Sequence, residues 1–464
     1  MERQKVFMGR KILLGTAALM TAAVVCWANG NGNLSEENAQ LRRRVEKLEK
    51  EVEQLKKMVM QQTEPAKAVK EETKSVPPPK LDEIDLQKIA AKIQKETEKK
   101  KPARSDLDIQ LYGYLKLDAA YDTSRIDNGN YAKWVQSEST NHNDDQFNMT
   151  ANESRLGMRI NGPQEGDMNT SGRVEVDFYG GGSENKSQIM MRHAYLKIDW
   201  PAERFNVIAG QTSDVISPLY PATLNYSVGW WAGNIGYRRP QIRLTKSLAL
   251  TSDVDLTWEG ALARTIGITT TPDFTPGDAG EDTGFPGVQT RASVMFPLLG
   301  YKPTTFGLSG HWASEELDLD ETGNHKDFDS WSVNLDLDQP VNKWLTVKGE
   351  VFTGENLSAY LGGIGQGVNT TTYEEISSRG GWIAASLGPW SKCRFNVGTS
   401  MDDVDSSDIN TGGRTLNRTV FGNLIYSLGK STEIGLELSH WRTDYSGGGD
   451  ADSLRAQTSL IYRF

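Results

Sequence analysis

Six arginines stand in segments where every second residue is apolar, and each has the parity of the polar face: Arg155, Arg159, Arg173, Arg239, Arg243 and Arg291. A guanidinium group carries a permanent charge and binds a carboxylate through two parallel hydrogen bonds. Such groups along one surface predict attraction of small anions. Glu153, Glu175 and Asp177 lie on the same face, so the alternative is that each arginine is paired with a neighbouring carboxylate.

The elements that would position these arginines are β-strands. In residues 153–160, for example, Leu156, Met158 and Ile160 fall on one face and Arg155 and Arg159 on the other, a period of two. Sixteen segments of this kind begin near residues 109, 151, 171, 188, 204, 234, 251, 287, 303, 327, 343, 379, 391, 416, 432 and 454. We therefore expect sixteen strands with one apolar and one polar face.

The connections between these segments alternate in length. Short connections, such as 200–204, 339–342 and 429–430, alternate with long polar ones, such as 122–150, 213–233 and 355–378. An even number of strands with short turns at one rim and long loops at the other is typical of an outer-membrane barrel. The predicted fold is all-β, a 16-stranded antiparallel transmembrane β-barrel over residues 105–464, wide enough to hold a water-filled lumen.

The last segment carries a further signal. Leu454, Leu460, Tyr462 and Phe464 share one face, and the sequence ends on Phe464. A terminal aromatic residue with this spacing resembles the C-terminal signal that the outer-membrane assembly machinery reads. We therefore expect the final strand to face lipid.

The first 28 residues read as a signal peptide. The apolar run 12–27 follows four basic residues and ends at Ala28, where we expect cleavage. An uncleaved anchor helix is the alternative, although the run is shorter than the roughly 20 residues of a membrane span. Removal of Cys26 with the signal would leave Cys393 alone, which excludes an intramolecular disulfide.

Residues 34–62 have the heptad repeat of an α-helical coiled coil preceding the barrel. Leucines at 34, 41, 48 and 55 alternate with Asn38 and with valines at 45, 52 and 59, and the flanking charges pair with opposite sign in a parallel register. Valine and leucine in these positions favour two strands, and three stay open. Residues 63–104 contain the run 77–79 of prolines and then a lysine-rich helical stretch, which predicts a stiff linker and a short solvated helix.

Charge excludes one class of partner. Residues 105–464 carry 29 basic and 46 acidic side chains, a net charge of −17. Nucleic-acid binding needs a basic face, so no nucleic acid is expected as a partner.

Several short motifs of the chain resemble the DcaP-like trimeric outer-membrane porins. They are residues 112–114 (Tyr-Gly-Tyr), 152–157 (Asn-Glu-Ser-Arg-Leu-Gly), 192–195 (Arg-His-Ala-Tyr), 209–211 (Ala-Gly-Gln) and 237–243 (Tyr-Arg-Arg-Pro-Gln-Ile-Arg). The resemblance implies a homotrimer in the outer membrane, in contact with its lipid and lipopolysaccharide, with the coiled coils in the periplasm and pores for small anionic solutes such as dicarboxylates.

In porins of this build the third long loop folds into the lumen. By analogy the constriction lies in residues 213–233, with the pore-lining arginines opposite. This loop contains Asp214, Tyr220, Tyr226, Trp230 and Trp231.

Other chemistry is sparse. Residues 318–323 resemble the start of a calcium loop but have no flanking helices, so a solvated acidic loop is the simpler interpretation. A barrel hydrolase using His193 or His440 with a serine is a remote alternative, and no cofactor, metal or enzyme activity is expected. A second functional hypothesis is a structural barrel whose periplasmic arm tethers the membrane to the cell wall or to a partner.

Overall fold

The structure is a computed structural model. It describes residues 107–181, 187–266, 283–318, 322 and 324–464, and the predicted signal peptide, coiled coil and linker lie outside these ranges. Within the described ranges, no helix is long and apolar enough to cross a membrane.

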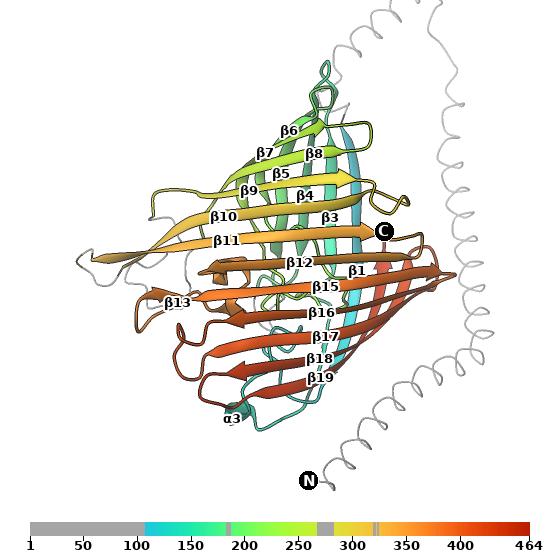
Figure 1. Cartoon of the computed structure of the whole chain (residues 1–464). Helices are drawn as coiled ribbons and strands as arrows, with labels where there is room; N and C mark the ends of the chain where they lie inside the picture. The colour runs from blue at the N-terminus through green and yellow to red at the C-terminus, as the bar shows by residue number, and fades with distance from the viewer. Residues whose placement is uncertain (1–106, 182–186, 267–282, 319–321, 323) are drawn as a thin grey trace, which may run out of the picture. The chain divides into compact units, whose positions relative to one another are not determined.

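Long β-strands dominate the described part of the chain (Figure 1). In the large sheet they are β1 (Asp108–Asp122), β2 (Gln146–Thr150), β3 (Arg155–Asn161), β4 (Asn169–Asp177), β5 (Met190–Trp200), β6 (Phe205–Ser213), β7 (Arg238–Ala249), β8 (Asp255–Ala263), β9 (Gly287–Phe296), β10 (Thr304–Asp318), β11 (His325–Pro340), β12 (Leu345–Glu355), β15 (Ser377–Trp390), β16 (Cys393–Val404), β17 (Arg414–Ser427), β18 (Thr432–Tyr445) and β19 (Ala451–Arg463).

These strands close into an antiparallel barrel. Each pairs with its neighbour in sequence, and β1 pairs with β19 in a register that places Tyr114 opposite Arg463. On its other edge β1 pairs with both β2 and β3, which are two pieces of one barrel strand separated by residues 151–154. The described sheet is therefore a barrel of sixteen strands, which confirms the predicted fold class for this part of the chain.

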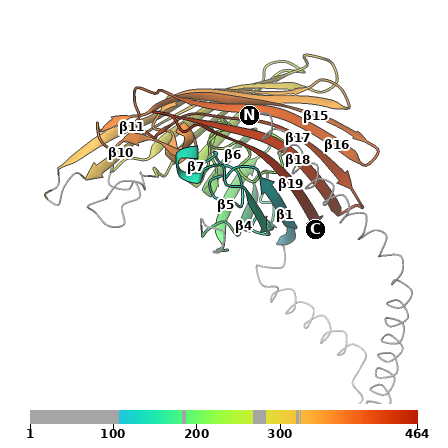
Figure 2. The ribbon, with the colours of Figure 1, turned by 90° about the horizontal axis from the view of Figure 1, so that it is seen from below.

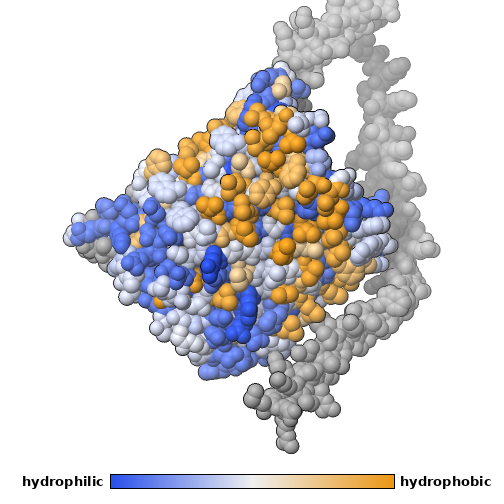
Figure 3. All heavy atoms as spheres, in the orientation of Figure 1, coloured by the Kyte–Doolittle hydropathy of each residue, from blue (hydrophilic) through white to orange (hydrophobic). Residues whose placement is uncertain are grey.

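Side chains alternate between the two faces of the sheet. On β11, Val333, Leu335 and Leu337 are exposed on the outer face, whereas Asn334 and Asp336 are buried on the inner face. Apolar side chains gather in a broad band on the outside, and hydrophilic ones cover the end where β10 and β11 project (Figure 3). An apolar exterior with a polar interior is the opposite of a water-soluble core and matches a barrel surrounded by lipid.

The long connections contain short elements of their own. Residues 123–145 hold α3 (Glu138–Asn141), and residues 356–376 hold η1 (Ser358–Tyr360), η2 (Gly363–Gly365) and the small hairpin of β13 (Val368–Asn369) and β14 (Glu374–Glu375). Every predicted strand begins within five residues of the observed one. Among the strands of the large sheet, the sequence pattern missed only the separate piece β2, because its polar neighbours had placed residues 146–150 in the long loop 122–150. It also did not predict the short elements inside the long connections.

Candidate functional site

Residues 214–237, between β6 and β7, fold into the barrel and contact its far wall. Glu350 on β12 accepts a hydrogen bond from the backbone N–H of Leu219 at 2.8 Å, and Glu437 on β18 accepts one from Leu224 at 2.6 Å. Gly233 has φ +110°, and a Cβ there would lie 2.3 Å from the carbonyl oxygen of Gly381 on β15, so only glycine fits. This inward-folded loop therefore spans the lumen from β6 and β7 to β12, β15 and β18.

Two further long connections brace the inward-folded loop. From residues 356–376, Leu361 accepts a hydrogen bond from the Trp231 N–H at 2.7 Å. From residues 123–145, Ala132 exchanges two hydrogen bonds with the side chain of Asn225, at 2.9 and 3.1 Å. Three segments far apart in sequence thus meet inside the barrel, in which β4–β7 stand opposite β15–β18 (Figure 2).

An aromatic cluster lies where the inward-folded loop meets the wall of β4 and β5. The ring centroids of Tyr226 and Tyr179 are 4.0 Å apart, and Tyr131 contacts both at 5.1 Å. Trp230 and Trp231 extend the cluster at 6.2–6.3 Å from Tyr226, Tyr131 and each other. Burial raises the pKa of Tyr226, so its hydroxyl stays protonated and donates a hydrogen bond to Asp177 at 3.1 Å.

The arginines on β3 and β4 gather around one buried glutamate. Glu175 forms ion pairs with Arg173 and with Arg155, the second at 3.5 Å. It also accepts a hydrogen bond from the hydroxyl of Tyr112 at 2.8 Å. The Arg159 guanidinium lies 4.5 Å from the ring centroid of Tyr112. Arg155 and Arg173 keep about a quarter of their side chains accessible, and Arg159 is exposed.

Two arginines outside the predicted set join this group. Arg192 donates to Glu175 at 2.9 Å and to Asp177 at 2.8 Å, although simple alternation along β5 would point it outward. A β-bulge between Glu175 and Val176 re-aims it, because a bulge places two residues of one strand opposite one of the other. The sequence contains a sign of this bulge, because Arg192 and His193 are consecutive polar residues that interrupt the alternation of polar and apolar side chains.

Arg238 is the second arginine outside the predicted set that joins this group. It is 3% exposed and lies against the rings of Trp230 and Tyr237, at 5.4 and 4.9 Å. Its Nε and Nη2 atoms are buried without a hydrogen-bond partner among the described residues. Adjacent Arg238 and Arg239 are again two polar residues in succession, a break in alternation that marks the start of β7.

The group of Arg155, Arg159, Arg173, Arg192 and Arg238, which we call the basic wall, has five positive charges against the two carboxylates of Glu175 and Asp177. The neighbouring group of Lys116 with Asp118 and Glu153 contributes one net negative charge. The summed formal charge of these two groups is therefore positive.

The other three predicted arginines lie in a neutral group. Arg239, 1% exposed, pairs with Asp214 at 2.8 Å and stacks on Tyr360. Arg291 forms a two-pronged pair with Asp336, at 2.7 and 2.9 Å, and Arg243 and Arg291 share Glu259. These three arginines are thus balanced by three carboxylates. Pairing of arginines with carboxylates was the alternative interpretation of the sequence.

Of the predicted loop residues, three belong to the aromatic cluster, namely Tyr226, Trp230 and Trp231. Asp214 instead anchors the inward-folded loop to the barrel wall. Besides Arg239, its carboxylate binds the side chain of Gln289 and the backbone N–H of Tyr237, both at 2.8 Å. Tyr220 lies edge-on to Trp230 at 6.4 Å and is 40% exposed.

The two histidines of the alternative hydrolase interpretation lie in separate places among the described residues. His193 contacts Thr212 at 3.1 Å, and His440 pairs with Asp452 on the outer face at 3.5 Å. Glu316, His325 and Asp327 lie close together at the tip of β10 and β11, next to the predicted acidic loop, of which residues 319–321 and 323 are outside the described ranges.

Comparisons with known proteins agree with this architecture. Residues 82–246 match the family model of the DcaP outer membrane protein. Among solved structures, the outer membrane channel DcaP of Acinetobacter baumannii is 19% identical, with a TM-score of 0.63 over 78% of this chain and 98% of that chain. The anion-selective porin of Comamonas acidovorans is 12% identical, with a TM-score of 0.50 over 77% of this chain and all of that one.

OmpF of Salmonella typhi is similar at 13% identity, with a TM-score of 0.50 over 77% of this chain and 98% of its own. No curated protein matches the chain. The sequence match in residues 82–246 and the shared barrel fold together confirm the predicted resemblance to the DcaP outer membrane proteins.

Proposed function

We propose that the protein is an outer-membrane porin through which small hydrophilic anions, such as dicarboxylates, diffuse passively. The observation that carries the proposal is the basic wall, in which five arginines accompany two carboxylates beside the inward-folded loop. Charged groups that line a narrow passage with low-dielectric walls raise the local concentration of ions of opposite sign.

The position of the basic wall supports anions over cations. Exposure of its arginines falls from Arg159, which is exposed, through Arg173 to the buried Arg238 beside the aromatic cluster. An anion moving along this wall would exchange one guanidinium for the next, so no single site would hold it tightly. Shared, weak sites of this kind permit entry and release.

The neutral group of Arg239, Arg243 and Arg291 has a different role in this proposal. Asp214 and Asp336 are buried with Arg239 and Arg291, whereas Glu259 and Arg243 are partly buried. Asp214 ties the inward-folded loop to β7 and β9 through Arg239 and Gln289. Buried pairs of this kind fix geometry and contribute little net field. We infer that these arginines hold the loop in place and that selectivity resides in the basic wall.

The test is the reversal potential of the purified protein in a planar bilayer under a potassium chloride gradient. The proposal expects anion preference, and dicarboxylates added on one side should then carry current. Cation preference would mean that the surplus of acidic residues elsewhere outweighs the basic wall. Absence of any conductance would contradict the porin itself.

A further inference from the structure

The ends of β10 and β11 carry an imidazole and two carboxylates on their outer face. Glu316 on β10 stands directly opposite Asp327 on β11, and His325 precedes Asp327 by two residues on the same strand. His325 and Asp327 share the face of the outward residues Val333 and Leu335, because alternate residues of a strand point to the same side. Glu316 belongs to that face too, since directly opposed residues of an antiparallel pair are neighbours on one side of the sheet. The three side chains therefore lie outside the lumen.

This group lies beyond the apolar band of the barrel. Hydrophilic side chains cover the end where β10 and β11 project (Figure 3). Asp327 is exposed, and the side chains of His325 and Glu316 keep 48% and 21% of their surface accessible. Cations in the surrounding water therefore have direct access to the three side chains.

The distances among the three side chains suit a shared ion. One ring nitrogen of His325 and one carboxylate oxygen each of Glu316 and Asp327 lie within 4.8 Å of one another. Nδ1 of His325 is 3.6 Å from Oε1 of Glu316, which is too long for a hydrogen bond. Around a tetrahedral zinc ion with bonds of about 2.0–2.2 Å, neighbouring ligand atoms are about 3.4 Å apart. The separation of Nδ1 and Oε1 thus matches two ligands of one ion, and a rotation of the exposed Asp327 side chain would bring in the third.

The two carboxylates have no basic side chain to compensate them. Among the described residues, neither Glu316 nor Asp327 forms an ion pair with a lysine or an arginine. The adjacent Lys326 belongs to the opposite face of β11 and donates its ammonium hydrogen bond to the carbonyl oxygen of Tyr373. Like charges directly opposite each other on neighbouring strands destabilise the pair. A divalent cation between the carboxylates would remove this repulsion.

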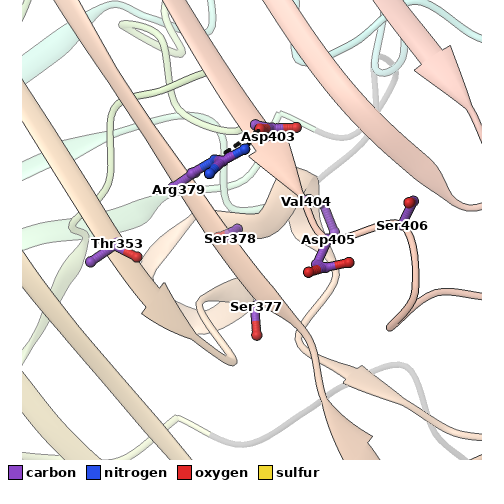
Figure 4. Close-up of a pocket in the computed structure, with 8 residues that line it drawn as sticks. All are labelled: Thr353, Ser377, Ser378, Arg379, Asp403, Val404, Asp405 and Ser406. Carbon is purple, nitrogen blue, oxygen red and sulfur yellow. Dashed lines mark hydrogen bonds and ion pairs between the residues drawn. The ribbon is translucent and has the colours of Figure 1, made fainter.

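Acidic side chains elsewhere at the long-loop end of the barrel are arranged differently. Where β15 begins and β16 ends, Arg379 donates to Asp403 through Nε and Nη2, at 3.0 and 2.9 Å (Figure 4). The residues that line this cavity include a guanidinium and no imidazole. The group on β10 and β11 is therefore distinguished by its imidazole and by the lack of a basic partner among the described residues.

We propose that Glu316, His325 and Asp327 bind one divalent transition-metal cation of the zinc type on the outside of the barrel. An imidazole ligand favours zinc, copper or nickel over calcium and magnesium, which take oxygen ligands. Three protein ligands leave the fourth tetrahedral position to water. The bound ion links the ends of β10 and β11. The inference does not rest on the proposed function, because the site faces away from the lumen.

The experiment is isothermal titration of zinc chloride into the purified, untagged protein after treatment with a chelator. One zinc ion per chain should bind, and an excess of calcium should not displace it. His325→Ala removes the imidazole and should weaken zinc binding about tenfold or more. His440→Ala is the matched control, because His440 is an exposed histidine of the outer face that meets a single carboxylate, Asp452, at 3.5 Å. This control should bind zinc like the unaltered protein.

Asp327→Asn separates loss of the site from loss of the fold. In the metal-free protein this change removes a like charge opposite Glu316, so the midpoint of thermal unfolding should not fall. The variant should nevertheless bind zinc more weakly. Zinc should raise the unfolding midpoint of the unaltered protein, because a ligand that binds only the folded state stabilises it, and it should raise that of Asp327→Asn less.

Two results would overturn the proposal. Equal zinc affinity of His325→Ala and His440→Ala would mean that the zinc is bound elsewhere on the chain. Displacement of zinc by calcium at equal concentration would mean that the imidazole is not a ligand and that the carboxylates act as an ordinary acidic surface. Bilayer conductance reports separately on the porin, so a conducting protein that binds no zinc would contradict only this inference, and a zinc-binding protein that does not conduct would contradict only the proposed function.

Discussion

Arg192 and Arg238 show that the backbone, and not parity alone, decides which charged side chains enter the lumen. A bulge turns Arg192 toward Glu175 and Asp177, and Arg238 is the first residue of β7. Without these two arginines, the other three members of the basic wall would carry one positive charge more than the carboxylates of Glu175 and Asp177. With them, the excess is three positive charges. At the scale of residues, the expected anion preference depends on these two positions.

Arg238 provides the clearest test of the basic wall. Arg238→Gln removes a charge without leaving a carboxylate unpaired, because no ion pair of Arg238 is present among the described residues. We expect the ratio of anion to cation permeability, measured from the reversal potential, to fall. Arg418→Gln removes the same charge from the exposed, outward side of β17 and should leave the ratio unchanged. Equal shifts in the two variants would place the selectivity outside the lumen.

Glu175 is expected to stabilise the barrel. It is 1% exposed and pairs with Arg155, Arg173 and Arg192, so Glu175→Gln leaves three guanidinium groups facing one another. Loss of one partner from such a buried group costs about 3 kcal/mol. Thermal unfolding followed by circular dichroism should show a lower midpoint for this variant. Glu203→Gln, in an exposed turn, is the matched control and should unfold like the unaltered protein.

At the scale of elements, the inward-folded loop is held by wall side chains that accept hydrogen bonds from its backbone. Glu437 accepts hydrogen bonds from two groups of the loop, the Leu224 N–H and, at 2.7 Å, the Thr223 hydroxyl. It also accepts one at 2.9 Å from the side chain of Asn423 on the neighbouring strand β17. A loop segment that loses such partners inside a barrel opens more often.

We therefore expect Glu437→Ala to produce additional current fluctuations in single-channel recordings. Glu433→Ala on the same strand removes a carboxylate that pairs with Arg394 and Arg463, away from the loop. It should unfold more readily but conduct as steadily as the unaltered protein. A quiet Glu437→Ala channel would mean that the remaining contacts of the loop suffice.

The strands could be predicted from sequence and the loop contacts could not, for a physical reason. Alternation is a local property, so residues such as Leu335 and Asp336 reveal their faces directly. Glu350 and Glu437 contact residues 131 and 213 positions away, and nothing near them in sequence marks those partners. Aromatic residues of the loop were recognisable as a cluster, but their partners Tyr131 and Tyr179 come from other connections.

At the scale of the whole molecule, the barrel is complete without the N-terminal region. The closing pairs of β1 and β19 and the inward-folded segments all lie within the described residues from 107 onward. We expect removal of residues 34–101 to leave single-channel conductance and ion preference unchanged, while the assembly measured by light scattering loses stability if residues 34–62 form a coiled coil. An envelope defect that persists although the shortened barrel conducts normally would favour the tether over the porin.

The terminal residue should affect assembly more than stability. Phe464 exchanges backbone hydrogen bonds with Gly113, at 3.1 and 3.2 Å, and its side chain is half exposed beside Tyr462. Phe464→Ala keeps both hydrogen bonds but removes the exposed ring. We expect less of this variant in isolated outer membranes, whereas the protein that is assembled should resist heat like the unaltered protein. Equal amounts of both in the membrane would contradict a role in assembly.

The pairing of β1 with β19 also means that the two ends of the barrel chain meet at one seam. A circular permutant that joins residue 464 to residue 107 through a short linker, and begins instead in the loop 405–413, would keep every strand pair of the present fold. Its last strand would be β16, which ends at Val404, with Phe464 moved to the interior of the sequence. Such a protein would separate what the phenylalanine contributes as the end of a chain from what it contributes as a neighbour of Gly113.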